Sequence, residues 1–513
     1  MMQQCGRLRS FQIALVMLAG ALALPAAAQT RGGTVTLGVE QDIAGFDPLV
    51  VGVYDTGQTA TARLLFDTLT KLDDNAKPVP SLALSWSPSG DFKTWTFKLR
   101  PGVKFQDGTP LNAAAVANSF ERQLDPNAHC RCAIYISFID KVEAADDLTV
   151  VFHLKNPSPN FAALVSGTYA NWPIHSPTAI QKLKEGYNRH PVGSGPFRLK
   201  SWQSGDRLVL ERNPDYWDKD HVYLDEVVIR PMPDNTARFA SVQSGETDII
   251  WHDRADDILK AKKDPHLAVH EYVGSGATVY AFNTKRPPFD DVRVRQALRM
   301  ALDLKTFSET LFDGLWQPAK DPWGPGSFVQ CKDSGTLPYD PEKAKALLKE
   351  YGKPVAFKMV VTATPRGRQI GQAFQEMWKD VGVDMTIDQI DQTALVTKAF
   401  RRDFDLTPWR IVDAADPDIQ AYANFHSGSP VNLSGYSNPE VDKLLEDARN
   451  SGDQEQRVAD YCKLAQILNR DVPWFWTLDN HYFSISKPGL MGLPKQYSDI
   501  IDLSHAWWEK KKS

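Results

Sequence analysis

The sequence has no excess of positive charge. Its 58 lysines and arginines are outnumbered by 63 aspartates and glutamates, and the formal net charge is −5 at pH 7. A surface that binds nucleic acid or an anionic membrane needs a stripe of basic side chains. The composition therefore argues against both kinds of partner.

Common catalytic motifs are also lacking. The sequence contains no G-x-S-x-G nucleophile elbow, no H-E-x-x-H zinc helix and no G-x-x-x-x-G-K-S/T phosphate loop. The segment 129–132 (HCRC) could hold a metal, but structural zinc sites separate paired cysteines by two to four residues and need a second pair, which is missing. We therefore expect no metal, no cofactor and no enzymatic activity.

Long apolar runs are absent apart from one near the start. Residues 11–24 (FQIALVMLAGALAL) form an apolar run that is shorter than the ~20 residues needed to span a bilayer. Arg7 and Arg9 precede the run and small residues at 25–28 (PAAA) follow it, which is the pattern of a secretory signal peptide. We expect cleavage near Ala28 and export to the periplasm, without a lipid anchor because no cysteine closely follows the run.

Cysteine is scarce as well. The chain has five cysteines, and Cys5 belongs to the predicted signal peptide. The others are Cys130, Cys132, Cys331 and Cys462, which an oxidising compartment allows to form disulfides. Four cysteines permit three complete pairings, and the sequence does not distinguish among them.

Hydrophobic periodicity predicts an α/β fold. Alternating residues predict strands at 34–39, 94–99, 149–154 and 207–212. In the later half, strands at 355–361, 384–390 and 404–409 flank a helix at 369–381, and capping signals at Asp340-Pro341 and Asn438-Pro439 begin two more helices. Such alternation is typical of α/β layering. The exported length of about 485 residues implies two or three domains.

A series of short segments carries a family resemblance. They are 80–86 (PSLALSW), 95–110 (WTFKLRPGVKFQDGTP), 191–197 (PVGSGPF), 212–217 (RNPDYW), 244–248 (SGETD), 282–284 (FNT) and 289–303 (FDDVRVRQALRMALD). Together, and in this order, they resemble the family 5 extracellular solute-binding proteins, the dipeptide and oligopeptide group that serves ABC importers. Turn and helix-cap chemistry accounts for their residue types, so we assign the segments themselves no ligand role.

The resemblance implies a two-lobed periplasmic binding protein of the type II-like, three-domain peptide-binding class. A discontinuous domain would comprise 29–73, 196–280 and 483–513, with an inserted domain at 74–195, and the second lobe would span 281–482. The chain would cross between the lobes near 280–283 and 479–483, which are the expected hinge. Lobes of this kind close around a ligand by a hinge motion.

The resemblance also implies how a peptide would be held. The segment 409–418 (WRIVDAADPD) is similar to the loop that presents a carboxylate to the peptide's amino group, and Asp413 matches that carboxylate. Arg368 best matches the arginine that binds the carboxylate of a dipeptide, and Arg366 lies beside it, both ahead of the predicted helix at 369. Charge-assisted bonds of this kind are among the stronger hydrogen bonds in proteins.

Five further residues are candidates for weaker ligand contacts. Tyr54 and Trp409 would stack on the solute, and the backbone of Gly274, Ser275 and Gly276 would bond to an extended ligand. An aromatic side chain in the core or the hinge would have the same residue type, so this alternative stays open for both aromatics.

We expect a monomer that delivers a small solute, most simply a short peptide, to the permease subunits of an ABC importer. The same fold also carries opines, nickel chelates, haem and oligosaccharides, and a sensory receptor would have the same sequence features, so these alternatives stay open. Asp413 and Arg368 facing one cleft would favour a peptide.

Overall fold

The computed structural model describes residues 29–51, 55–74, 76–130, 132, 136–167, 172–411, 416–494 and 500–510. The predicted signal peptide, Tyr54 and Asp413 lie outside the described residues.

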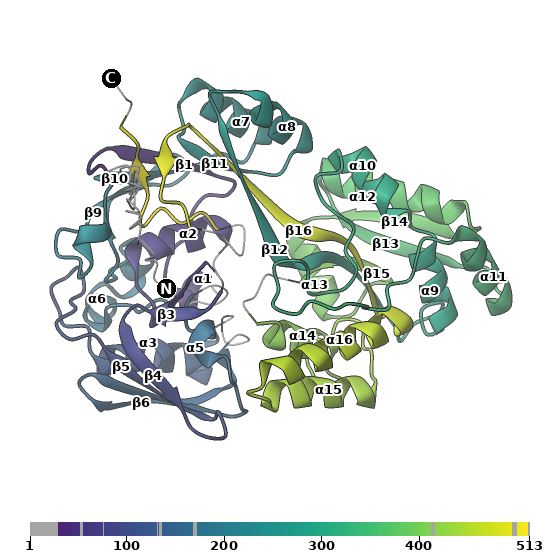
Figure 1. The fold of residues 1–513 in the computed structure, drawn as a ribbon, viewed down its shortest axis with the longest axis horizontal. Coiled ribbons are helices and arrows are strands. Elements are labelled where there is room, and N and C mark those ends of the chain that lie inside the picture. Colours follow the sequence, from purple (N-terminus) through teal and green to yellow (C-terminus); the bar gives the residue numbers. More distant parts are fainter. Residues whose placement is uncertain are drawn as a thin grey trace, which may run out of the picture.

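Two long strands join the two halves of the molecule. The antiparallel pair β12 (Ala268–Phe282) and β16 (Trp474–Ser486) runs from one half to the other (Figure 1). We call the part before β12 and after β16 the first half, and the part between these strands the second half. The register of the pair shifts between Val273 and Ala277, so the ladder is irregular near the middle of both strands. The predicted hinge segments therefore lie on β12 and β16, and the predicted domain boundaries stay a prediction.

Both strands belong to one sheet of 10 strands in the order β14-β13-β15-β12-β16-β11-β1-β10-β9-β8. In the first half, β1 pairs in parallel with β10 and β11, and β8 and β9 extend the sheet in antiparallel fashion. The bounds are β1 (Thr34–Val39), β8 (Phe197–Gln203), β9 (Arg207–Arg212), β10 (Glu226–Pro231) and β11 (Ile249–His252). The helices α2 (Thr56–Leu65), α7 (Asn235–Ser244) and α8 (Ala255–Lys263) accompany these strands.

A second sheet forms its own core within the first half. Its strands, in the order β4-β5-β7-β6, are β4 (Ala83–Pro88), β5 (Thr94–Leu99), β6 (Ile139–Asp146) and β7 (Thr149–Leu154). Aromatic side chains of β5, β7 and the short helix α5 (Phe161–Leu164) pack together in this core, as in the contacts of Phe161 with Phe97 and Phe152. The neighbouring short elements are α1 (Pro48–Val51), β2 (Thr70–Leu72), β3 (Pro78–Pro80), α3 (Ala113–Leu124), α5 (Phe161–Leu164), α6 (Pro177–Leu183) and the 3-10 helices Pro126–Ala128, Lys184–Arg189 and Lys219–His221.

The second half combines parallel strands with helices on both faces. Its strands are β13 (Ala356–Thr362), β14 (Asp384–Ile390) and β15 (Leu406–Arg410). Its helices are α9 (Val292–Met300), α10 (Leu304–Phe312), α11 (Pro341–Tyr351), α12 (Pro365–Lys379), α13 (Gln392–Phe400), α14 (Asp418–Phe425), α15 (Pro439–Asn450) and α16 (Gln454–Asp471). The chain then returns along β16 to the first half and ends with the β17 (Leu490–Met491) and β18 (Trp507–Trp508) pair.

The structure confirms the α/β fold and most predicted elements. The strands predicted at 34–39, 94–99, 149–154, 207–212 and 384–390 have the predicted bounds, and Asp340 and Asn438 cap α11 and α15. The helix predicted at 369–381 instead begins at Pro365, where the Thr364 side chain accepts a bond from the Gly367 N–H. Arg366 and Arg368 therefore lie in the first turn of α12, not ahead of it.

Two disulfides account for the four cysteines. Cys130 pairs with Cys132, and Cys331 pairs with Cys462 across 131 residues of sequence. The first pair occupies the segment that we considered as a metal site. Among the described residues, no group of three or more histidines, cysteines, aspartates or glutamates comes together as a metal site would require.

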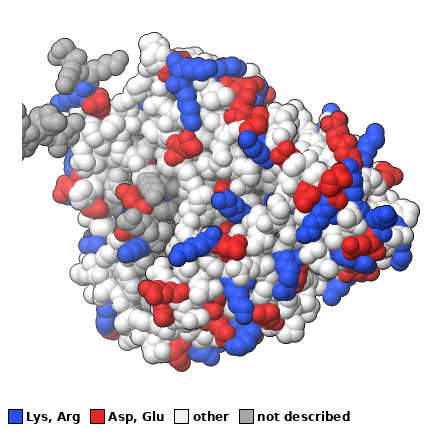
Figure 2. Space-filling model, turned by 45° about the vertical axis from the view of Figure 1, so that its right-hand side comes forward, with Lys and Arg blue, Asp and Glu red and all other residues white. Residues whose placement is uncertain are grey.

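The surface carries charges of both signs. On the face shown in Figure 2, lysines and arginines are interspersed with aspartates and glutamates across both halves. Of the helices in the described ranges, none is both long and apolar enough to span a membrane.

Candidate functional site

The carboxyl ends of β13, β14 and β15 form one edge of the sheet, because these strands run parallel. Side chains alternate along β13, so that Met359 and Val361 join one hydrophobic cluster and Val360 joins the other. The helix α12, which follows β13, packs in the first cluster, whereas α13 and α14, which follow β14 and β15, pack in the second. Ligands of α/β sheets bind in the crevice where consecutive helices change face. Here that crevice lies between the carboxyl ends of β13 and β15.

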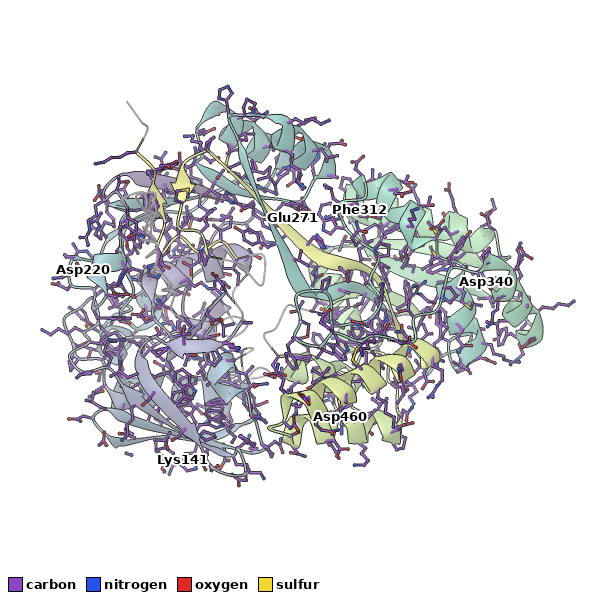
Figure 3. All side chains as sticks on the ribbon, in the orientation of Figure 1. Lys141, Asp220, Glu271, Phe312, Asp340 and Asp460 are labelled. Atoms are coloured by element: carbon purple, nitrogen blue, oxygen red, sulfur yellow. A yellow bond between two sulfur atoms is a disulfide. The ribbon has the colours of Figure 1, made fainter. Side chains whose placement is uncertain are left out.

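The two predicted arginines lie at this edge. Arg368 is exposed, and its Nε donates to the side-chain oxygen of Gln389 on β14 at 3.2 Å. Arg366 instead crosses to the first half, where its Nη1 lies 2.7 Å from Oδ2 of Asp253, directly after β11. The Arg366 guanidinium is also 4.9 Å from the ring of Phe312, a residue that Figure 3 labels where the second half approaches the first. No local pattern in the sequence indicated this link between the halves.

The segment of Gly274, Ser275 and Gly276 reaches the same edge from the neighbouring strand. It occupies the irregular part of β12, where the Gly276 N–H donates to the carbonyl of Trp323 at 2.5 Å. The Gly274 carbonyl accepts from Gly326 at 3.0 Å, and the Ser275 carbonyl accepts from Asn480 at 3.0 Å. A Cβ on Gly276 would lie 2.5 Å from the carbonyl oxygen of Ile411, at a φ of +86°. Only glycine therefore lets β12 approach the chain that follows β15.

Trp409 lies one residue before the end of β15, opposite Val279. Its ring is half-buried beside the second hydrophobic cluster and contacts the ring of Phe400 edge-on, with centroids 5.9 Å apart. Trp409 is therefore in part a packing residue.

The loop predicted to carry the amino-group ligand is fixed on both sides. Before it, the Ile411 N–H donates to the Ala277 carbonyl at 3.3 Å. After it, Asp416 accepts two bonds from the Arg457 guanidinium, at 2.6 and 2.7 Å, and both side chains are at most 4% exposed. Asp416 also accepts from the Asp418 N–H at 2.9 Å and so orients the start of α14. The ends of the 412–415 loop therefore lie at the edge where Arg366 and Arg368 lie.

A buried acid that was not among the candidates predicted from the sequence lies on β16, one of the two strands that join the halves. Asp479 of β16 pairs with Ala277 of β12 and is 9% exposed. Burial, and to a lesser extent the nearby Asp321 carboxylate, raise its pKa to about 7 against the opposing effect of Lys320. The only cue in the sequence was an acid directly after the largely apolar run 474–478 (WFWTL). Glu271, which Figure 3 labels, precedes Ala277 on β12, and its carboxylate accepts from Lys262 at 3.1 Å.

Asp479→Asn is expected to stabilise the protein at pH 8 more than at pH 5. An unfolded aspartate has a pKa near 3.9, so the folded state keeps a proton that the unfolded state loses between about pH 4 and 7, and the free energy of unfolding falls across that interval. The asparagine side chain does not titrate, so the variant keeps its stability across this interval. At pH 8 its free energy of unfolding is expected to exceed that of the wild type by on the order of 1–3 kcal/mol. Urea unfolding at both pH values measures it, with exposed Asp215→Asn as the control. An equal gain at both pH values would contradict the assignment.

Comparisons with known proteins agree with this architecture. Residues 77–432 match the bacterial extracellular solute-binding proteins, family 5. The chain is 30% identical over 491 residues to the di/tripeptide-binding protein 2 of Pseudomonas aeruginosa, covering 88% of this chain and 91% of that protein. It is 29% identical over 484 residues to the heme-binding protein A of Haemophilus influenzae, covering 87% of each.

A solved structure gives the same result for the fold. The periplasmic binding protein DppA of Helicobacter pylori, in complex with the peptide STSA, superposes with a TM-score of 0.82 at 25% identity, covering 94% of this chain and 99% of that one. The two-lobed architecture is therefore confirmed.

Proposed function

The chain belongs to family 5 of the bacterial extracellular solute-binding proteins, and from this premise we propose that it is the periplasmic subunit of an ABC importer and captures a short peptide. The observation that carries the proposal is the convergence at one sheet edge of two arginines, the 274–276 segment and both ends of the 412–415 loop. A peptide always offers an ammonium, a carboxylate and a main chain, whereas its side chains vary. One charged group for each terminus therefore recognises peptides as a class.

Each predicted residue has a distinct role in this proposal. Asp413 binds the peptide ammonium, and Arg368, which is exposed at the start of α12, binds the carboxylate. Arg366 holds Asp253 and links the two halves beside the bound peptide. Water between the variable side chains and the protein allows different peptides to bind. Tyr54 and Trp409 remain the candidates for stacking on the solute. The backbone candidates Gly274, Ser275 and Gly276 shape the wall of the site, because the Gly274 and Ser275 carbonyls and the Gly276 N–H already bond within the protein.

Capture requires closure of the two halves, and contacts between described residues of the two halves include the following two. One is the Arg366–Asp253 ion pair near the hinge strands. The other joins Phe92, in the turn between β4 and β5, to Gly452, between α15 and α16; a Cβ on Gly452 would lie 2.6 Å from Cζ of Phe92. Hinge closure brings such surfaces together around a solute. The closed monomer then docks on the membrane permease, and no chemical step is needed.

A non-peptide solute is the second candidate, and the similarity to a heme-binding protein favours it. Calorimetric titration of protein stripped of ligand by unfolding and refolding distinguishes the two candidates. Trialanine is expected to bind with a Kd in the micromolar range or below, and haemin is expected to produce no saturable heat. Saturable binding of haemin without binding of trialanine would overturn the peptide proposal.

A further inference from the structure

A cavity of about 240 Å³ lies between the two halves, beside α14. The first half contributes Phe138, the 156–158 segment and Leu164, and the second half contributes residues of α14, the 428–431 loop and Arg449. Figure 1 shows α5 and α14 on opposite sides of this boundary. Pockets that hold a whole drug-sized ligand measure about 300–1,000 Å³, so this cavity fits one part of a solute. We call it the inter-half cavity.

The inter-half cavity is close to the proposed ammonium site along the chain. Asp418, which lines the cavity, follows Asp413 by five residues, so at most ~18 Å of chain separates them. We take the cavity as a second contact for a solute held by Asp413, and the peptides described below test this reach.

Arg449 is the one cationic side chain among the described residues that line the cavity. Its side chain is 16% exposed, and its Nε donates to both carboxylate oxygens of Asp418, at 2.9 and 3.1 Å. The guanidinium lies over the Tyr422 ring, 3.6 Å from the centroid, which fixes its plane. An arginine has five N–H donors, and the four on Nη1 and Nη2 have no acceptor among the residues that the structure describes. Arg449 therefore presents unused donors at a largely buried position.

Asp418 determines which acceptor groups can bind to those donors. Among the described residues that line the cavity, only Asp418 and Arg449 are charged, so the lining is neutral as a whole. An incoming carboxylate would lie close to Asp418 and be repelled, whereas a carbonyl oxygen can accept from the free N–H groups without that repulsion. Phe138, Leu164 and Ile419 give the cavity apolar walls that suit a short aliphatic stem. The lining also includes uncharged polar residues, which suit a neutral polar end group: Ser137, Asn156, Ser158 and Ser429. His426 stacks on the Tyr422 ring, with centroids 4.2 Å apart, and its Nε2 lies 3.3 Å from the carboxylate of exposed Glu446.

We propose that the inter-half cavity is a subsite for a neutral hydrogen-bond acceptor on the bound solute, a carboxamide on a short aliphatic stem, and that Arg449 donates to it while Asp418 excludes a carboxylate. The proposal rests on the proposed function and adds a side-chain preference to a site that otherwise reads only the peptide termini.

Nine tripeptides test the proposal. Each is trialanine with glutamine, glutamate or norleucine at one of its three positions, and each is titrated by calorimetry into wild-type protein, Arg449→Met and Asp418→Asn. Lys443→Met, an exposed change on the same helix α15, is the matched control. Circular dichroism and the unfolding temperature show whether each variant folds.

The expected result is a pattern at a single position of the tripeptide. At that position, wild-type protein and Lys443→Met bind the glutamine peptide about tenfold or more tightly than the norleucine peptide. They also bind the glutamine peptide more tightly than the glutamate peptide. Arg449→Met binds glutamine and norleucine equally, and Asp418→Asn prefers glutamate to glutamine because the arginine is no longer neutralised.

Three results would overturn the proposal. They are a wild-type preference for glutamate, the absence of any preference at all three positions, and a glutamine preference that Asp418→Asn leaves unchanged. If Arg449→Met fails to fold, the comparison of wild type with Asp418→Asn still decides. If wild-type protein binds none of the nine peptides, the proposed function falls with it; if it binds them without a preference, only the subsite falls.

Discussion

Asp413→Ala is expected to weaken the binding of trialanine at least a hundredfold without changing the unfolding temperature. A hundredfold loss corresponds to about 2.7 kcal/mol, within the range of about 2–5 kcal/mol for truncating one partner of a buried charge pair at a binding interface. The loop that carries Asp413 is fixed by Ile411 on one side and by the Asp416–Arg457 pair on the other, so the truncation removes a charge and leaves these anchors in place. Calorimetric titration of wild-type and variant protein measures the change.

A modified peptide isolates the ammonium as the cause. N-acetyl-trialanine has no ammonium, so it is expected to bind weakly and with equal affinity to the wild-type protein and to Asp413→Ala. Asp413→Asn keeps the size of the side chain and is expected to resemble the alanine variant. Unchanged trialanine affinity in Asp413→Ala would refute the assignment of this residue.

Arg457→Met is expected to lower the free energy of unfolding by about 3–5 kcal/mol, since it leaves the Asp416 carboxylate buried without its partner. Arg457 is 4% exposed and Asp416 3% exposed, and two bonds shorter than 2.8 Å join them. The same change frees the start of α14, so weaker peptide binding is expected as well. Urea denaturation measures the stability, and titration measures the affinity.

A surface pair provides the matched control. Arg198 and Glu211 form a comparable contact at 2.7 Å, but their side chains are 44% and 35% exposed. Arg198→Met is expected to cost no more than about 1 kcal/mol, because exposed ion pairs contribute little. The double variant Asp416→Asn with Arg457→Met is expected to recover part of the lost stability. Equal losses for Arg457→Met and Arg198→Met would contradict the role given to the buried pair.

Local signals in the sequence were sufficient to predict much of the fold. Asp340-Pro341 and Asn438-Pro439 begin helices, and the period-2 segments form strands, because capping and alternation depend on neighbouring residues. Thr364-Pro365 is the same kind of signal and begins α12, although the apolar pattern alone placed the start at residue 369. Helix starts are therefore predicted better by caps than by hydrophobic periodicity here.

The contacts that connect distant parts of the chain could not be predicted in this way. Arg366 meets Asp253 across 113 residues, and Cys331 meets Cys462 across 131. Each of these residues has several chemically equivalent partners elsewhere in the sequence, and only the packing of the sheet selects one. Arg295 shows the same difficulty: it is 6% exposed and donates to the carbonyls of Asp471 and Phe289, both outside its own helical turn.

The candidate site was predictable in kind but not in arrangement. The family resemblance selected Asp413, Arg366 and Arg368, and the sheet brings the two arginines and the ends of the 412–415 loop to one edge. The sequence did not show that Arg366 already has a partner in the first half, nor that Arg449 lies in a cavity between the halves. Both depend on how the two halves meet.

Native mass spectrometry of the protein purified from a bacterial periplasm is the most direct test of the central claim. The protein is expected to carry non-covalent masses that fit a series of short peptides, and Asp413→Ala purified in parallel is expected to carry none. Release with organic solvent and fragmentation would identify the peptides by sequence. A single non-peptide mass, such as haem or a metal chelate, would retain the solute-binding fold and contradict the proposal that this protein captures peptides.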